Sequence, residues 1–133
     1  MRQTYDLISE KIEAKIPELP SSFSDYRIGF LSDFHLGPFV PHEWVEAGIS
    51  AIRNQSVDLL VLGGDYIGVP DSRIARLFGD YRNSRFSSIA ESDLALRIFS
   101  DVTDLLSMLS PPDGIIAVFG NHEHRNSPRD CIK

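Results

Sequence analysis

The chain contains 133 residues, of which 42% are hydrophobic and 24% are charged. This composition is typical of a folded globular domain, and it excludes an intrinsically disordered chain, a collagen-like repeat and a coiled coil. The 13 basic and 19 acidic residues give a net charge of −6, which argues against a surface that binds nucleic acid through its phosphates. A phosphate-bearing substrate remains compatible with this charge, because a metal ion can supply positive charge locally.

Cysteine content and hydropathy indicate the compartment. Cys131 is the only cysteine, so the chain forms no internal disulfide and offers no cysteine-based zinc site. The first residues lack the apolar core of a signal peptide, and no apolar run approaches the roughly 18 residues that span a bilayer. These features predict a soluble, cytoplasmic protein.

Residues 8–24 are predicted to form an N-terminal strand and a connector. The apolar residues of the strand fall at even positions: Ile8, Ile12, Ala14 and Ile16. Alternation of this kind is typical of a half-buried strand, although the isoleucines are also spaced four apart, so a short helix fits the same pattern. Pro17 and Pro20 end the segment.

Residues 25–123 are predicted to form an α/β core, in which a mostly parallel sheet is flanked by helices. Three short apolar runs are the predicted strands: residues 26–31, 57–62 and 115–119. Two segments with an apolar face at helical spacing alternate with them: residues 41–53 and 88–109. Strands that alternate with helices favour parallel pairing. Residues 124–133 are predicted to be a tail, and nothing marks a second domain.

Local signals support both helices. Pro41 suits a first helical turn, and Trp44 is expected to pack in the core beneath the helix that follows. Ser88 and Glu91 have the spacing of a capping box at the start of the second helix. Residues 66–87, which precede that helix, lack periodicity and are predicted to be a long loop.

Polar residues follow each predicted strand at its carboxyl end. Asp33 and His35 follow the first strand, Asp65 follows the second, and Asn121 and His122 follow the third. Because the carboxyl ends of parallel strands share one edge of the sheet, these side chains are expected to converge there. Asp33 and His35 are two residues apart, so in an extended segment they would face the same way and chelate one ion.

The residue types at this edge predict metal chemistry. Carboxylate, imidazole and amide donors without a thiolate suit manganese, iron or zinc, and the choice among them stays open. A carboxylate in the middle position, Asp65, could bridge two ions, and paired ions are a common device for hydrolysing phosphate esters. Taken singly, each residue would more simply be a turn or surface residue. Their coincidence at three strand ends favours the metal site.

The same residues resemble those of the calcineurin-like metallophosphoesterases. The motifs of that family, Asp-x-His, Gly-Asp and Gly-Asn-His-[Asp/Glu], are present in order as Asp33-Phe34-His35, Gly64-Asp65 and Gly120-Asn121-His122-Glu123. The sequence of residues 31–38 is most similar to that of a bacterial branch of the family, which includes YkuE-type phosphoesterases and some UDP-2,3-diacylglucosamine pyrophosphohydrolases of lipid A synthesis. The resemblance implies the N-terminal half of a four-layered αββα sandwich.

The resemblance also implies roles for individual residues. Asp33 and His35 would bind a first divalent metal ion, Asp65 would bridge, and Asn121 would bind a second ion. His122 would be the catalytic residue beside the phosphate, and a hydroxide activated by the two ions would attack phosphorus. Glu123 would support the loop rather than bind metal.

Two departures from the family pattern qualify the predicted activity. The later histidine motifs of the family are missing, and His42 and His124 stand in no such motif. The second sheet of the sandwich is missing as well. Residues 1–133 are therefore predicted to be a single, truncated metallophosphoesterase domain. The alternative is a non-catalytic fragment that binds metal or a partner, and self-association through the unfinished sheet is expected in that case.

Substrate and partner expectations follow from the same branch. A phosphate ester or a nucleotide-diphospho-lipid is the expected substrate, with peripheral contact to the inner membrane. Solvated surface charge is the favoured interpretation of four arginines in the predicted loop, although they could attract a diphosphate: Arg73, Arg76, Arg82 and Arg85. Phe39 lies near the expected site and could contact a lipid tail.

Overall fold

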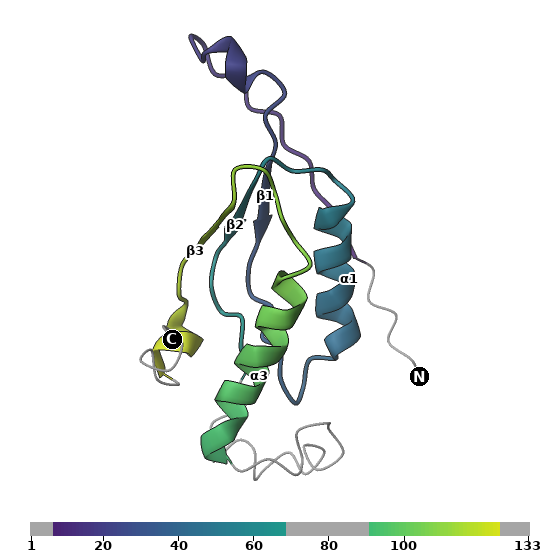
Figure 1. Cartoon of the computed structure of the whole chain (residues 1–133), viewed down its shortest axis with the longest axis vertical. Helices are drawn as coiled ribbons and strands as arrows, with labels where there is room; N and C mark the ends of the chain where they lie inside the picture. The colour runs from purple at the N-terminus through teal and green to yellow at the C-terminus, as the bar shows by residue number, and fades with distance from the viewer. Residues whose placement is uncertain (1–6, 69–90, 126–133) are drawn as a thin grey trace.

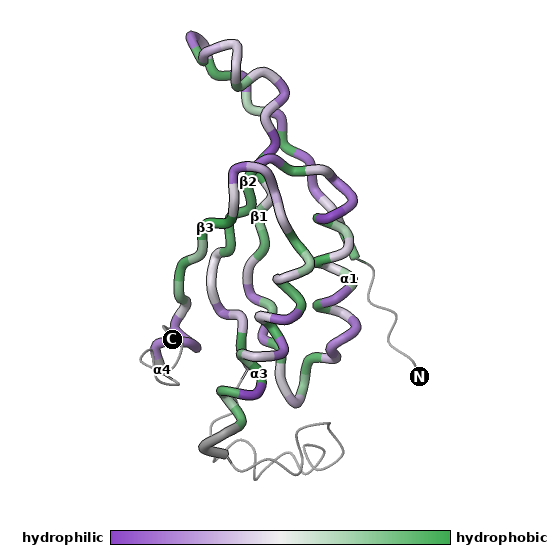
Figure 2. Tube along the Cα trace, in the orientation of Figure 1, coloured by the Kyte–Doolittle hydropathy of each residue, from purple (hydrophilic) through white to green (hydrophobic). Residues whose placement is uncertain are grey.

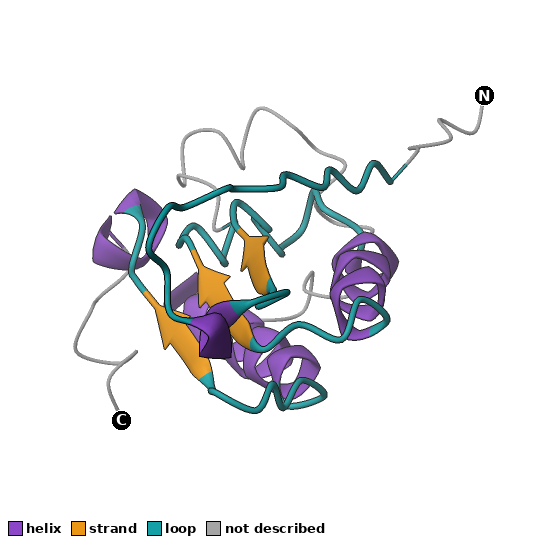
Figure 3. Ribbon diagram, turned by 90° about the horizontal axis from the view of Figure 1, so that it is seen from above, coloured by secondary structure: helices purple, strands orange, loops and turns teal. Residues whose placement is uncertain are grey.

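The computed structural model describes residues 7–68 and 91–125, and the side chains of residues 91–93 and 125 are left aside. Three short strands form one parallel sheet in the order β1, β2, β3. They are β1 (Ile28–Leu31), β2 (Leu59–Leu62) and β3 (Ile115–Ala117). Two helices, α1 (His42–Arg53) and α3 (Glu91–Leu106), lie on one side of the strands (Figures 1 and 3). The predicted parallel sheet flanked by helices is confirmed.

The core lies between the sheet and these two helices. Alternate residues of β2, Leu60 and Leu62, point toward the helices and are buried. α1 contributes Val45 and Ile49, which lie about one helical turn apart. The helices α1 and α3 also contact each other. The buried apolar residues are Leu36, Val45, Ile49, Leu60, Leu62, Tyr66, Ile67, Leu94, Ile98, Val102, Leu105 and Leu109. Figure 2 shows hydrophobic residues concentrated in the strands and recurring along both helices.

The helices differ from the predictions in detail. α1 begins at His42, and Pro41 is its N-cap with an extended backbone. Val45 and Ile49 define the inner face, so Trp44, one residue around the helix, is 38% exposed and the prediction that it packs in the core is wrong. The capping box from Ser88 and the four loop arginines lie outside the described residues. Within the described ranges, no helix is long and apolar enough to cross a membrane.

The predicted N-terminal strand is wrong. Residues 7–20 form neither strand nor helix, and Ile8 and Ile12 are 80% and 89% exposed. No backbone hydrogen bond joins residues 7–15 to the sheet in the part of the chain that the structure describes. A half-buried strand needs a neighbouring strand for its amides, and this segment has none among the described residues. Residues 7–12 face β1 and α1 across a cavity instead of packing on them, so their apolar side chains stay exposed. A short 3-10 turn, Ser21–Phe23, then leads toward β1.

The open face of the sheet is the one that points away from α1 and α3. It carries the strand residues that alternate with the buried ones. Ile28 and Phe30 of β1 point away from the helices and are 61% and 63% exposed. Phe30 is in register with Val61 of β2, which in turn is in register with Ile116 of β3. A parallel sheet is ordinarily covered on both faces, whereas no described helix or strand packs on this apolar row, and residues 7–12 face its β1 end only across a cavity.

Candidate metal centre

The segments that follow β1 and β2 run side by side beyond the ends of the strands. Three backbone N–H groups of the first segment donate to carbonyl oxygens of the second: Asp33 to Gly64 (3.0 Å), His35 to Asp65 (3.0 Å) and Leu36 to Tyr66 (2.9 Å). Leu36 and Ile67 form an isolated parallel bridge and are fully buried. The first two residues of the predicted loop, Tyr66 and Ile67, are buried in the core. The start of this loop therefore extends the pairing of β1 and β2.

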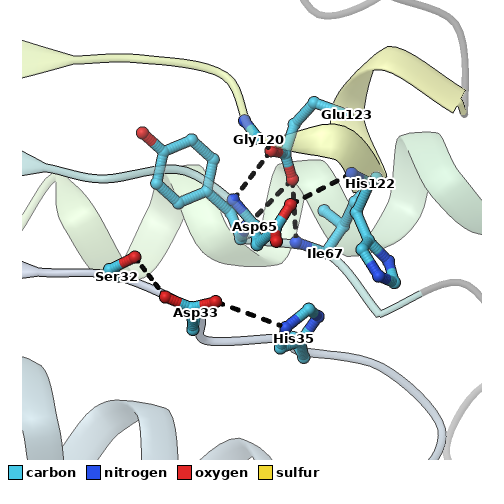
Figure 4. Close-up of polar contacts among 9 residues, drawn as sticks. Ser32, Asp33, His35, Asp65, Ile67, Gly120, His122 and Glu123 are labelled. Atoms are coloured by element: carbon cyan, nitrogen blue, oxygen red, sulfur yellow. Dashed lines mark hydrogen bonds and ion pairs between the residues drawn. The ribbon is translucent and has the colours of Figure 1, made fainter.

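This pairing brings the three predicted ligands together. Ligand atoms of Asp33, His35 and Asp65 all lie within 4.8 Å of one another. His35 Nε2 is 3.8 Å from Asp33 Oδ1, so one oxygen of that carboxylate faces the imidazole (Figure 4). The expected convergence of Asp33, His35 and Asp65 at the carboxyl edge of the sheet is confirmed.

The backbone of the ligands explains how they converge. Asp33, His35 and Asp65 have φ angles of 57°, 44° and 54°, in the left-handed region. They are three of the six non-glycine residues with positive φ in the described part of the chain. The extended segment assumed for Asp33 and His35 is therefore wrong, because tight left-handed turns, held by the paired loops, direct the side chains. Such conformations cost about 1–3 kcal/mol each and cluster at functional sites.

Each carboxylate has one oxygen committed to the protein. Ser32 Oγ donates a short hydrogen bond to Asp33 Oδ2. The backbone N–H of His122 donates to Asp65 Oδ1 at 3.0 Å. Asp33 Oδ1 and Asp65 Oδ2 are the oxygens that these bonds leave for a ligand. Ser32 was not singled out from the sequence, where a serine before an aspartate has no distinguishing pattern.

The loop after β3 brings the predicted catalytic histidine to the same place. His122 lies on the short helix α4 (Asn121–Arg125), and its ring centroid is 4.5 Å from that of His35 at an interplanar angle of 73°. Asn121 is the first residue of α4 and is exposed, directly beside His122 in the chain. The structure thus groups four of the five predicted site residues, and Asn121 adjoins them in sequence.

Two buried side chains hold the loops in place. Glu123 is fully buried and accepts backbone hydrogen bonds from both the β2 and β3 loops, as its predicted supporting role requires. Tyr66 Oη donates to the carbonyl of Val118 at 2.6 Å. Burial raises the pKa of the Tyr66 phenol above its usual value, so it stays a hydrogen-bond donor at neutral pH. This anchor was not singled out from the sequence. The signal that could have indicated it is the apolar pair Tyr66 and Ile67, which directly follows Asp65.

The remaining histidines stand apart from the cluster. His42 Nδ1 is 3.9 Å from Glu46 Oε2 within α1. His124 is exposed, and its ring packs edge-on against Phe119 with centroids 6.2 Å apart. Phe39, the residue considered for lipid contact, is exposed on the segment before α1.

The donor set fits a divalent ion. Zinc binds nitrogen and oxygen ligands at about 2.0–2.2 Å in a tetrahedral arrangement, so two ligands of one ion are about 3.5 Å apart. The three donor atoms, all within 4.8 Å of one another, would therefore have to close by up to about 1 Å to hold one ion, which side-chain rotation can supply. Two carboxylates also supply the negative charge that offsets a divalent cation.

Curated proteins similar to this chain are phosphoesterases. The chain is 30% identical to phosphodiesterase YaeI of Escherichia coli over 114 residues, which cover 86% of the chain and 33% of YaeI. It is 28% identical to an uncharacterized metallophosphoesterase of Aquifex aeolicus over 92% of the chain and 37% of that protein. It is 27% identical to the uncharacterized metallophosphoesterase YkuE of Bacillus subtilis over 80% of the chain and 29% of YkuE.

These matches are long for the chain and partial for the relatives. The chain spans about a third of the length of the curated relatives described above. The alignments nevertheless cover most of this chain, which carries the Asp33, His35 and Asp65 cluster. No protein-family model and no solved structure matches the chain.

Proposed function

Because this chain belongs to the metallophosphoesterase family, we propose that the cluster is the divalent metal site of a phosphoester hydrolase. The observation that carries the proposal is the approach of Asp33, His35 and Asp65 to within 4.8 Å, from two loops that the sheet pairs. A phosphodiester is the substrate class we favour, since the relative in Escherichia coli is named a phosphodiesterase.

The residues of the chain divide into binding and proton-handling groups. Asp33 Oδ1 and His35 Nε2 would hold one ion, and Asp65 would be shared between it and a second ion that Asn121 would also bind. Manganese, iron or zinc suits these donors. Such ions activate water and neutralise phosphoryl oxygens. Without them, the carboxylates of this acidic protein would repel a phosphate.

We propose that His122 faces the substrate. Its backbone N–H is fixed on Asp65, and its ring stands edge-on to His35 at the rim of the cluster. We assign to this imidazole the protonation of the leaving oxygen or the stabilisation of charge on the phosphoryl group. Both roles need only that the ring reach an oxygen next to the ions.

The test is metal binding by the 133-residue chain. Isothermal titration with Mn²⁺ should show that Asp65→Asn weakens affinity at least tenfold, about 1.4 kcal/mol, because a carboxylate ligand is replaced by a neutral amide. Asp104→Asn, an exposed Asp on α3, is the matched control and should bind as the wild type does. Equal affinity of Asp65→Asn and the wild type would refute the site. Hydrolysis of a generic phosphodiester with added Mn²⁺ is the accompanying activity assay.

A second candidate function is partner binding without catalysis. It is favoured by the open face of the sheet, where Ile28 and Phe30 are mostly exposed. Contiguous apolar surface of this kind marks an interaction site. Light scattering distinguishes the candidates, since a stable monomer with metal-dependent phosphodiesterase activity would leave no ground for this one.

A further inference from the structure

Glu123 is a charged side chain with no exposed surface. Both oxygens of its carboxylate accept backbone N–H bonds. Oε1 accepts from Tyr66 at 2.9 Å and from Ile67 at 3.2 Å. Oε2 accepts from Asp65 at 2.9 Å and from Gly120 at 2.8 Å. Figure 4 shows these bonds converging on one carboxylate from two loops. With both oxygens occupied in this way, Glu123 is not a metal ligand.

The bonds fix the register between the β2 and β3 loops. These loops pack backbone against backbone, because a Cβ atom on Gly64 would lie 2.5 Å from the Gly120 nitrogen. Glu123 reaches across this contact from α4 to the nitrogen of Asp65. The His122 amide then donates to the side chain of the same Asp65. One acidic residue therefore ties the central ligand to the loop that carries His122 and Asn121.

The chemistry of this tie requires a carboxylate of this length. Four N–H donors need acceptors on both oxygens, and an ionised carboxylate is an acceptor only. In glutamine, one oxygen becomes an NH₂ donor that would face two N–H donors. Aspartate keeps both acceptors but is one methylene shorter, so it would bond all four amides only if both loops lay closer to α4. Burying a charge is costly, and four charge-assisted bonds offset that cost here.

We propose that Glu123 is a positioning residue for the metal site, which sets metal affinity by holding Asp65 in its left-handed conformation (φ 54°). The proposal rests on the function proposed above for Asp33, His35 and Asp65. It goes beyond loop support, because it states that the geometry of a ligand, and with it the affinity for a cation, depends on a side chain that never touches the ion.

The first experiment compares Glu123→Gln with the wild-type chain by isothermal titration with Mn²⁺. Thermal unfolding in a chelator establishes the fraction of each protein that is folded. The folded Gln variant should bind Mn²⁺ at least tenfold more weakly, and the electron paramagnetic resonance spectrum of bound Mn²⁺ should change. Glu10→Gln, an exposed residue of the N-terminal segment, is the matched control and should change neither.

The outcomes separate the two proposals. If the wild-type chain binds no Mn²⁺, the proposed function fails, and this inference fails with it. If wild type and Glu123→Gln bind equally well and differ only in thermal stability, this inference alone is overturned, because Glu123 is then merely structural. Weaker binding by the folded variant supports both.

Two further measurements apply if Glu123→Gln does not fold. Glu123→Asp keeps the charge, and should fold while binding Mn²⁺ more weakly than the wild type. In the wild-type chain without metal, hydrogen exchange at the amides of Asp65, Tyr66, Ile67 and Gly120 should be slow, because all four donate to one buried carboxylate. Exchange of these amides at the rate of exposed loops would overturn the inference.

Discussion

The two faces of the sheet have the same kind of residues and opposite surroundings. On the face toward α1 and α3, Leu60 is fully buried and packs within the core. On the other face, Phe30 is 63% exposed although it is larger and equally apolar. β3 is exposed along its whole length. The covered face is stabilised by apolar burial, whereas the attachment of β3 to the rest of the protein depends on hydrogen bonds.

This contrast explains where the candidate metal centre lies. The Asp33, His35 and Asp65 cluster is at the carboxyl edge of the sheet, where the core residues Leu36, Tyr66 and Ile67 anchor the loops. Strained left-handed residues persist only where their surroundings hold them. The side of the molecule with the buried core therefore carries the candidate ligands, and the loop after β3 is joined to it through Glu123 and Tyr66.

The largest expected effect comes from matched truncations on the two faces. Leu60→Ala should lower the free energy of unfolding by about 2–5 kcal/mol, because it leaves a cavity beneath both helices. Phe30→Ala should change it by no more than about 0.5 kcal/mol, since the ring is mostly in water. Urea denaturation of the two variants gives the comparison. A similar loss in both would mean that Phe30 is covered in solution, and light scattering would then identify a second copy as the cover.

The elements on the covered face of the sheet were predicted well from the sequence. Glycines and prolines delimit the strands and α1, and the rule that ligands gather at the carboxyl ends of parallel strands placed Asp33, His35 and Asp65 together. The turns that achieve this were not predictable, because alternation in sequence does not reveal a positive φ at an aspartate or histidine. The orientation of Trp44 was missed for a related reason, since one residue of helical phase decides it.

The surroundings of the open face of the sheet could not be predicted in the same way. Alternating isoleucines in residues 8–16 show that the segment suits a strand, but they do not show whether a partner strand lies within this chain. The four bonds of Glu123 were also beyond the sequence, which indicated a support but not the amides it holds. Long-range backbone contacts depend on how two loops pack, and no local pattern encodes them.

An intermediate effect is expected from the bond that ties β3 to β2. Tyr66→Phe removes the hydroxyl that donates to the Val118 carbonyl and should cost about 1 kcal/mol. The loss should be concentrated in β3, so hydrogen exchange at Val118, whose N–H donates to Leu62, should accelerate more than exchange in α1. Uniform acceleration across the chain would contradict the separate attachment of β3.

The smallest effect concerns the other end of the sheet, where Tyr26 precedes β1 and Asp113 precedes β3. Tyr26 Oη donates to Asp113 Oδ2 at 2.6 Å, and this hydrogen bond is the main cause that raises the pKa of Tyr26 from 10.0 to about 12. A raised pKa means that folding favours the neutral phenol, so this contribution to stability is complete below pH 10 and is lost as the pH rises through about 12. The difference between the ultraviolet titrations of wild type and Tyr26→Phe should isolate the late ionisation of Tyr26 from that of Tyr66, and Asp113→Asn should return the pKa of Tyr26 toward the ordinary value. If Asp113→Asn left that titration unchanged, the side-chain bond would not form in solution, and the amino end of β3 would be held by its backbone bonds to the β2 side alone.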